Sequence, residues 1–414
     1  MSGLPVLPTS DSGKTLAFIG VALACVALAW ATTPRRVNST VQQDRGQPFF
    51  PDFTDPNAAT SLEVVEFDEQ TSAARPFKVL NRDGRWTIPS RDNYPADAGT
   101  RLASVAAAII ALKKDDVASE NMSDAERCGV VDPADETLPA TRGRGTRLTV
   151  RGVNEKVLAD IIVGKAVEGR PNLRYVRLPD QKRTYVARVD RLDVSTSFQD
   201  WIERNLLLVN REDIDQILIR NYATEANTGR VTQREMVALR KEGRDRWTAD
   251  GLAPGEAVDT YTMNLLVTKL VELVILDVRR KPPSVSAMLT GASAERRFLQ
   301  ADVADLAAKG FYFTAEGELL SNQGEVVVHT SAGIFYVLRF GEVATGTPDS
   351  RYLFISVGFD PRATPGPVPD QVRKQLEILR VRFAPWYYLV SNDNFQKIRV
   401  SRAQLIRTRS TARN

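Results

Sequence analysis

Histidine and cysteine are nearly absent from this chain. Its 414 residues contain one histidine, His329, and two cysteines, Cys25 and Cys128. A metal site with several histidines is therefore excluded, and a Ser-His-Asp triad would have to be built on His329 alone. Because Cys25 lies inside an apolar N-terminal run, we do not expect the two cysteines to pair. The chain has no disulfide framework.

An excess of charge of one sign is also lacking. The sequence has 55 Lys and Arg against 51 Asp and Glu, which leaves a net charge of +4. Basic residues between Arg230 and Arg246 are interleaved with acidic ones, as on a solvated face. A nucleic-acid footprint needs positive charge gathered on one face. We therefore expect no nucleic-acid partner.

Long apolar runs are scarce, and the one that stands out lies near the N-terminus. Residues 16–31 (LAFIGVALACVALAWA) carry no charge, and flanking threonines extend the run to residues 15–33. A membrane-spanning helix needs about 17–25 mostly apolar residues. The sequence therefore predicts an N-terminal tail at 1–14, a single transmembrane helix at 15–33 in contact with membrane lipid, and a tether at 34–60.

Two questions about this segment stay open from the sequence. Ala29-Trp30-Ala31 resembles a signal-peptidase site, so cleavage is an alternative to anchoring. Arg35 and Arg36 after the helix favour a cytoplasmic body by the positive-inside rule, although that rule is weak when a long domain follows the helix.

The rest of the chain contains an internal repeat. Arg85-Trp86-Thr87 recurs as Arg246-Trp247-Thr248, an offset of 247 − 86 = 161 residues. A helix with apolar residues at i, i+3, i+4 and i+7 follows each tryptophan. These helices end alike, at Asp116-Val117 and Asp277-Val278, with the same offset. Repeated spacing of this kind predicts two copies of one supersecondary unit.

A second, ungapped match follows in each copy. Two glycines, a proline, an arginine and a tyrosine recur at one spacing: Gly164, Gly169, Pro171, Arg174 and Tyr175, then Gly341, Gly346, Pro348, Arg351 and Tyr352. The offset is now 341 − 164 = 177 residues, so the second copy has a net insertion of 16 residues. The Gly-x4-Gly-x-Pro spacing lacks the Gly-Lys-Ser/Thr of a phosphate-binding loop and predicts a hairpin loop instead.

These patterns predict an α+β fold: an N-terminal transmembrane helix followed by two tandem repeats of a small antiparallel sheet packed with helices. We place the first unit at 61–210 and the second at 211–410, with a Pro-rich insertion near 361–385. The repeated residues, including Trp86 and Trp247, are interpreted as structural. Arg174 and Arg351 favour structural ion pairs over anion binding. We predict no catalytic, cofactor-binding or metal-binding residue, with Cys128 as a buried hydrophobe and His329 as an ordinary strand residue.

The ordered series of these motifs resembles a family of uncharacterised bacterial proteins, the domain-of-unknown-function family number four thousand three hundred and forty. The resemblance rests on Trp86, the helix at 100–117, the segment 128–133 (CGVVDP), the segment 161–164 (IIVG) and the segment 174–177 (RYVR). It implies a gene neighbourhood with gliding-motility-type ABC transporters and an extracytoplasmic body. It implies no catalytic residue or ligand.

Three functions remain as hypotheses. The first is a non-enzymatic accessory or assembly component of a membrane transport or surface machinery, anchored in the inner (cytoplasmic) membrane, with an ABC permease and ATPase as partners. The alternative is an extracytoplasmic ligand-binding module that uses the cleft between the two repeats. A hydrolase with a hidden Ser or Asp site is the third and is least favoured, because no convergent carboxylate pair is visible.

Overall fold

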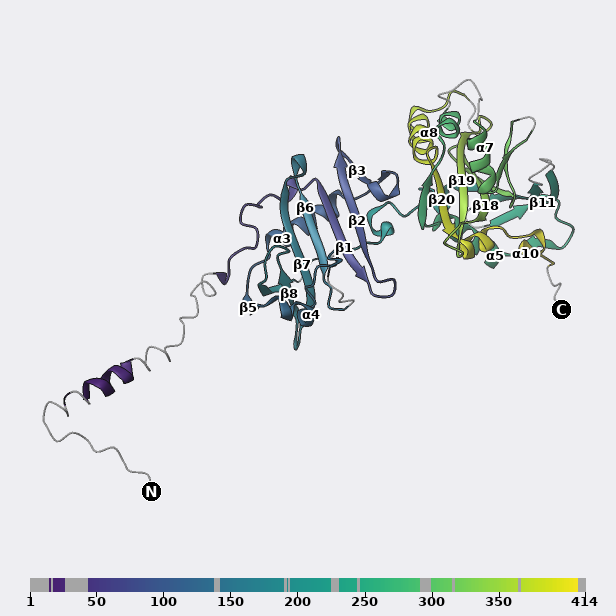
Figure 1. Ribbon diagram of the computed structural model, residues 1–414. Helices are drawn as coiled ribbons and strands as arrows, with labels where there is room; N and C mark the ends of the chain where they lie inside the picture. Colours follow the sequence, from purple (N-terminus) through teal and green to yellow (C-terminus); the bar gives the residue numbers. More distant parts are fainter. Residues whose placement is uncertain are drawn as a thin grey trace.

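A computed structural model describes residues 15, 18–26, 44–137, 142–189, 192, 194–224, 231–243, 246–290, 299–314, 317–363 and 366–408. Figure 1 shows two lobes in sequence order, each built on one large sheet. The fold is mixed α and β with antiparallel sheets, as the sequence predicted.

The first sheet has nine antiparallel strands in the order β4-β3-β2-β1-β6-β7-β8-β9-β5. Helix α3 (Gly99–Ile110) packs on it through Leu102, Val105, Ala106 and Ile109, the stripe that the sequence predicted. The strands are β1 (Ser61–Asp68), β2 (Ala73–Arg82), β3 (Arg85–Ile88), β4 (Tyr94–Pro95), β5 (Asp116–Ser119), β6 (Thr146–Arg151), β7 (Val157–Val167), β8 (Arg170–Arg177) and β9 (Thr184–Arg188).

The second sheet has eight strands in the order β12-β11-β10-β17-β18-β19-β20-β14, which repeats the order of the first from β3 onward. Helix α5 (Thr260–Val271) takes the place of α3. The internal repeat is therefore confirmed. The strands are β10 (Ile214–Thr224), β11 (Val231–Glu242), β12 (Arg246–Ala249), β14 (Asp277–Arg280), β17 (Glu325–Thr330), β18 (Ile334–Val343), β19 (Ser350–Phe359) and β20 (Trp386–Ser391).

Strand register supports the residue-by-residue alignment of the two units. Ala166 faces Arg174 across β7 and β8, and Val343 faces Arg351 across β18 and β19. Both pairs are 177 residues apart (343 − 166), the offset read from the sequence. The two units therefore share their hydrogen-bonding register as well as their strand order.

The described part of the predicted tether belongs to the first unit. Phe49 and Phe53 are buried, and the Phe49 amide donates to the carbonyl of Leu112 at 3.2 Å. In the second unit the Leu206 amide donates to the carbonyl of Leu273 at 3.1 Å, and 273 − 112 is again 161. Each unit thus begins with an extended segment that packs beside its main helix. Both units therefore start before residues 61 and 211, the first residues that the sequence predicted for them.

The second unit carries extra elements on the sheet face opposite α5. A cluster that includes Val285, Leu306, Phe311 and Tyr387 packs there, separate from the main core, and we call it the outer cluster. The second unit also contains α6 (Pro283–Thr290), α7 (Gln300–Ala308), β15 (Phe311–Phe313), β16 (Leu319–Ser321), α8 (Asp370–Phe383), α9 (Asn392–Ile398), α10 (Arg402–Leu405), β13 (Glu256–Val258) and β21 (Ile406–Thr408); α4 (Ala125–Cys128) lies in the first unit. Helix α8 occupies most of the predicted Pro-rich insertion.

The N-terminal apolar segment is described in part. Residues 15 and 18–26 are helical, and the other residues of the predicted span 15–33 lie outside the described residues. Over the part of the chain that the structure describes, no helix is both long enough and apolar enough to cross a membrane. The transmembrane helix therefore stays a prediction.

Candidate functional site

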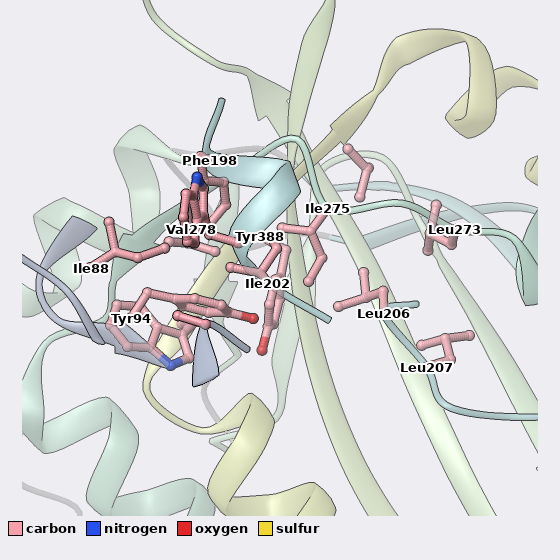
Figure 2. Packing of buried hydrophobic residues seen from close by; sticks show 14 of the residues in the cluster. Ile88, Tyr94, Phe198, Ile202, Leu206, Leu207, Leu273, Ile275, Val278 and Tyr388 are labelled. Carbon is pink, nitrogen blue, oxygen red and sulfur yellow. The ribbon is translucent and has the colours of Figure 1, made fainter. Parts of the chain in front are cut away.

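The two units meet at an apolar seam between an edge of each sheet. Tyr94 on β4 lies between two aromatic rings: its ring centroid is 5.0 Å from Trp386 on β20 and 5.5 Å from Phe198 in the segment between β9 and β10, which we call the linker. Figure 2 shows Ile88, Phe198 and Val278 around this point, with Ile202, Ile275 and Leu206 continuing the row of buried side chains. One hydrophobic core therefore runs through both units.

Polar contacts fix the same seam at its margin. Arg91 Nε donates to Asp277 Oδ1 at 2.6 Å, and Arg280 donates to the carbonyl of Asp92 at 3.2 Å. Arg382 at the end of α8 donates to the carbonyl of Asn205 at 2.8 Å. Arginines of each unit donate to acceptors on the other side of the seam, and such charge-assisted hydrogen bonds oppose rotation of one unit against the other.

Burial keeps the tyrosines in the seam neutral. The Tyr388 hydroxyl donates to the carbonyl of Arg382 at 2.8 Å, and burial raises the pKa of Tyr388 well above its usual value. Burial also raises the pKa of Tyr94. A phenol that keeps its proton at neutral pH serves packing and hydrogen bonding, and it is not a ready general base.

A groove opens at one end of the seam. It has a volume of ≈280 Å³, and its walls come from β4, the linker and α8. Ile378 and Val381 line it from α8 and are 64% and 59% exposed, respectively. Trp386 and Tyr94 form its inner end, beside Arg382. We call this surface the junction groove. Ile378 and Val381 thus present two large apolar side chains, one helical turn apart, to solvent.

A deeply buried basic side chain lies in the second unit. Lys281 follows β14 and is only 2% exposed. Its Nζ donates to the carbonyl of Phe383 at 3.0 Å and lies 3.7 Å from the centre of the Phe354 ring. Burial lowers the pKa of Lys281 well below its usual value, and the positive charge of Arg339 lowers the pKa further. The amine ties the start of α6 to the end of α8.

An ionic row crosses the same sheet face. Arg220, Glu325 and Arg339 are cross-strand neighbours on β10, β17 and β18. Arg220 Nη1 lies 2.5 Å and Arg339 Nε 3.1 Å from the carboxylate of Glu325, which is 3% exposed. The Tyr222 hydroxyl donates to the same carboxylate at 3.4 Å. A buried carboxylate with two guanidinium partners is a structural arrangement that fixes strand register.

A further set of polar groups lies beside the outer cluster of the second unit. The Tyr387 hydroxyl donates to Asp305 at 3.0 Å, and Lys309 pairs with the same carboxylate. Burial, with Asp305 adding negative charge, raises the pKa of Tyr387. The hydroxyl of Ser284 on α6 donates to the carboxylate of Asp302 on α7, which joins these two helices. Each polar side chain named here has a hydrogen-bond or ion-pair partner, which is typical of a packed network.

The residues singled out in the sequence occupy equivalent structural positions. Trp86 on β3 and Trp247 on β12 are both half-buried. Gly164 and Gly341 lie where a helix end crosses the sheet, so that an added Cβ would contact the carbonyl oxygens of Cys128 and Lys309, respectively. Gly169 and Gly346 have φ of +71° and +79° in the hairpin loops that the sequence predicted, beside Pro171 and Pro348.

The equivalent arginines differ in their surroundings. Arg174 is exposed, whereas Arg351 is buried and donates to the carbonyl of Gly341. The Arg351 guanidinium also lies 4.3 Å from the centre of the Phe395 ring. Tyr352 packs against the outer cluster of the second unit, and Tyr175 packs against a small cluster in the first unit that includes Cys128, Val130 and Ile162. An ion pair was expected for the arginines, but Arg351 bonds to a backbone carbonyl instead.

Cys128 and His329 lie in ordinary structural environments. Cys128 is fully buried, and burial raises the pKa of its thiol. His329 on β17 packs against Phe335 with ring centroids 5.4 Å apart, and burial lowers the pKa of its imidazole. In the described ranges of the chain, no group of three or more His, Cys, Asp or Glu side chains is arranged to hold a metal ion.

Sequence reasoning missed Tyr94, Lys281 and the exposed apolar pair on α8. The third had a visible signal, because Leu376, Leu379 and Phe383 form a buried stripe and leave Ile378 and Val381 on the other side of the helix. The first two had none, since Tyr94 lies in a short turn-like segment and Lys281 in a basic, Pro-rich one.

Comparison with known proteins places part of the chain in a family. Neither the curated proteins nor the solved structures gave a match to this chain. Residues 86–291, from Trp86 on β3 to just beyond α6, match the family described as "Domain of unknown function (DUF4340)". The match covers most of the first unit, from β3 onward, and the start of the second. The chain therefore belongs, over residues 86–291, to the DUF4340 family of uncharacterised domains.

Proposed function

We propose that this protein is a membrane-anchored, non-catalytic accessory or assembly component of a membrane transport or surface machinery, with an ABC permease and ATPase as its partners. The observation that supports it most is the apolar helix at residues 18–26. Every residue there is exposed, and Phe18, Val21 and Leu23 are 77%, 61% and 64% exposed, respectively. Each such side chain gains about 1.5–3 kcal/mol on leaving water, which favours insertion in lipid.

The body of the protein supports binding over chemistry. Its polar clusters are closed networks in which tyrosine, lysine and carboxylate groups are bonded to neighbouring elements. The junction groove, in contrast, presents Ile378 and Val381 to solvent. We assign this surface to the contact with the membrane partner. The choice of an ABC transporter as that partner, and of an extracytoplasmic body, comes from the family resemblance alone.

The seam favours this function over a ligand-binding cleft between the repeats. A cleft for a glycan or peptide needs an open, polar space between the units. Tyr94, Trp386 and Phe198 fill the space between the sheets, and the groove left at its end is small. A rigid seam makes the two units one extended body that holds the junction groove in a fixed shape.

The anchor is tested by membrane fractionation of the full chain. Wild-type protein is expected to stay in the membrane pellet after sodium carbonate extraction. Replacing both Val21 and Leu23 by Arg places two charges in the apolar helix, each costing about 2.5–3.5 kcal/mol near the bilayer centre. The double variant is expected in the soluble fraction, and the matched variant Val21→Ile with Leu23→Ile in the pellet. Wild-type protein that is released by carbonate contradicts the proposal.

A further inference from the structure

One strand edge is closed in the first unit and open in the second. In the first unit, β4 pairs with β3: the Ala96 amide donates to the Trp86 carbonyl at 2.9 Å, and the Asn93 amide donates to the Ile88 carbonyl at 3.1 Å. At the repeat offset of 161, Trp86 corresponds to Trp247 on β12, and β4 corresponds to the start of β13. Each unit therefore has a short strand at the same position in the repeat, β4 in the first and β13 in the second.

In the second unit this closing strand pairs elsewhere. Strand β13 forms a separate two-stranded sheet with β21, in which Ala257 faces Arg407, and β12 remains the edge of the large sheet. Between residues 246 and 258, all of which the structure describes, no backbone hydrogen bond joins β12 to β13. Strand β13 thus pairs with β21 and leaves β12 uncovered, whereas β4 covers β3 in the first unit.

A groove lies between β12 and β13. Its volume is ≈540 Å³, and Trp247, Leu252, Ala257, Val258 and Met263 are among the side chains that line it. Met263 on α5 is buried beneath it and is 1% exposed. At the rim, Arg246 and Glu242 form an ion pair of 3.0 Å whose side chains are 77% and 48% exposed, respectively. We call this the β12 groove.

We propose that the β12 groove binds a short extended peptide segment of a partner protein, which pairs with the main chain at Trp247 and places one apolar side chain over Met263. The inference goes beyond the proposed function, because it concerns a different surface from the junction groove and does not require membrane anchoring. Unpaired strand edges are templates for another strand, and addition of an extended peptide to a sheet edge is a common recognition mode.

The chemistry of the groove defines its occupant. Strand β4 closes the first unit with only two paired residues, so a segment of similar length is sufficient for main-chain pairing at Trp247. Side chains of an extended peptide alternate between the two faces. One side chain therefore enters the apolar floor between Trp247 and Met263, and its neighbours face solvent near Arg246 and Glu242. An aliphatic residue flanked by polar ones satisfies both surfaces.

The probe for this site is a phage-displayed library of random heptapeptides panned against the purified full-length chain in detergent. We expect enriched peptides with one aliphatic residue between polar ones, which bind as synthetic peptides in a fluorescence polarisation assay. Ala257 lines the groove from β13, so Ala257→Trp fills it and is expected to weaken binding at least tenfold. The control is Met236→Trp, which adds the same indole at a position on β11 that is 60% exposed and does not line the groove.

The thermal unfolding of Ala257→Trp and Met236→Trp is measured first. Both variants must melt within a few degrees of wild type before their peptide binding is compared. A second variant, Leu252→Trp, fills the groove from the connecting loop in case Ala257→Trp fails to fold. The proposal is overturned if no peptide is enriched, or if groove-filling leaves peptide binding unchanged. It is also overturned if the wild-type chain self-associates and Ala257→Trp makes it monomeric, because the occupant is then a second copy of the chain. Loss of membrane anchoring affects none of these readouts.

Discussion

The ring of Tyr94 packs edge-on against the indole of Trp386, with centroids 5.0 Å apart and an angle of 66° between the planes. Tyr94 belongs to β4, an edge strand of the first sheet, and Trp386 opens β20, which lies next to the edge strand β14 of the second sheet. This aromatic pair therefore joins the edge strand of one sheet to a strand next to the edge of the other. With the other buried side chains of the seam, it gives the two units a common hydrophobic core.

Removal of the Tyr94 ring is expected to uncouple the two units. Tyr94→Ala leaves a cavity in a fully packed seam, and truncation of a buried aromatic costs about 3–5 kcal/mol of unfolding free energy. Tyr94→Phe keeps the ring and is expected to cost about 1 kcal/mol, from loss of the hydroxyl contact with Tyr388. Differential scanning calorimetry measures the outcome: we expect one transition in wild type and two in Tyr94→Ala.

Tyr261→Ala provides the matched control, because this tyrosine on α5 is 75% exposed. Its unfolding free energy should stay within about 0.5 kcal/mol of wild type. A single sharp transition in Tyr94→Ala, at the wild-type temperature, would show that the seam does not couple the units.

The stability of the protein is expected to rise with pH because of Lys281. Burial lowers its pKa in the folded state well below the ordinary 10.5. Between the folded-state pKa and 10.5, the unfolded chain holds a proton that the folded chain lacks, so the unfolding free energy increases with pH. The slope from this group is at most about 1.4 kcal/mol per pH unit. Urea unfolding between pH 7 and about pH 10 measures it.

Lys281→Met isolates this contribution, since methionine fills the same space without a charge. The variant should lose the slope, so that its stability relative to wild type is greatest at low pH and declines as pH rises. Lys374→Met on the exposed side of α8 is the control and should keep the wild-type slope. Equal slopes in wild type and Lys281→Met would mean that the amine keeps its ordinary pKa.

The two glycines of the second unit's motif are expected to differ in their tolerance of alanine. A Cβ at Gly341 would meet the carbonyl oxygen of Lys309 and the Phe311 ring, so Gly341→Ala should cost more than about 2 kcal/mol. Gly346 has φ of +79° and open space around it, so Gly346→Ala should cost only about 1–2 kcal/mol from backbone strain. Chemical denaturation of both variants tests the order, and a larger loss at Gly346 would contradict the packing argument.

The sequence predicted the repeated fold because its constraints are local. Gly164 and Gly341 are required where a helix end crosses a strand, and Trp86 and Trp247 occupy the same half-buried strand position. Such residues recur at fixed spacing, and the register of Ala166 with Arg174 repeats as that of Val343 with Arg351. The helix stripes were readable for the same reason, since amphipathic periodicity reports burial within one unit.

The candidate site could not be predicted because it depends on contacts between distant segments. Lys281 lies in the sequence Arg-Arg-Lys-Pro-Pro, which is typical of an exposed basic turn, yet the end of α8 covers it. Tyr94 is buried only because Phe198 and Trp386 come from the linker and from the far end of the second unit. Phe49 was read as part of a tether, although its ring packs against Tyr185.

Substitution of the apolar pair on α8 is expected to abolish partner binding without unfolding the protein. Ile378 and Val381 are 64% and 59% exposed, so replacing both by Asp should change the unfolding free energy by less than about 1 kcal/mol. Val153 in the first unit is 70% exposed, and Val153→Asp is the matched control. Neither substitution should affect anchoring through the N-terminal helix.

The central claim is tested most directly by extracting a C-terminally tagged chain from its own membranes in mild detergent and identifying the proteins that co-purify by mass spectrometry. The account predicts a stoichiometric ABC permease and ATPase with wild type and with Val153→Asp, and their loss with the Ile378→Asp, Val381→Asp double variant. A wild-type protein that comes out of the membrane alone would contradict it.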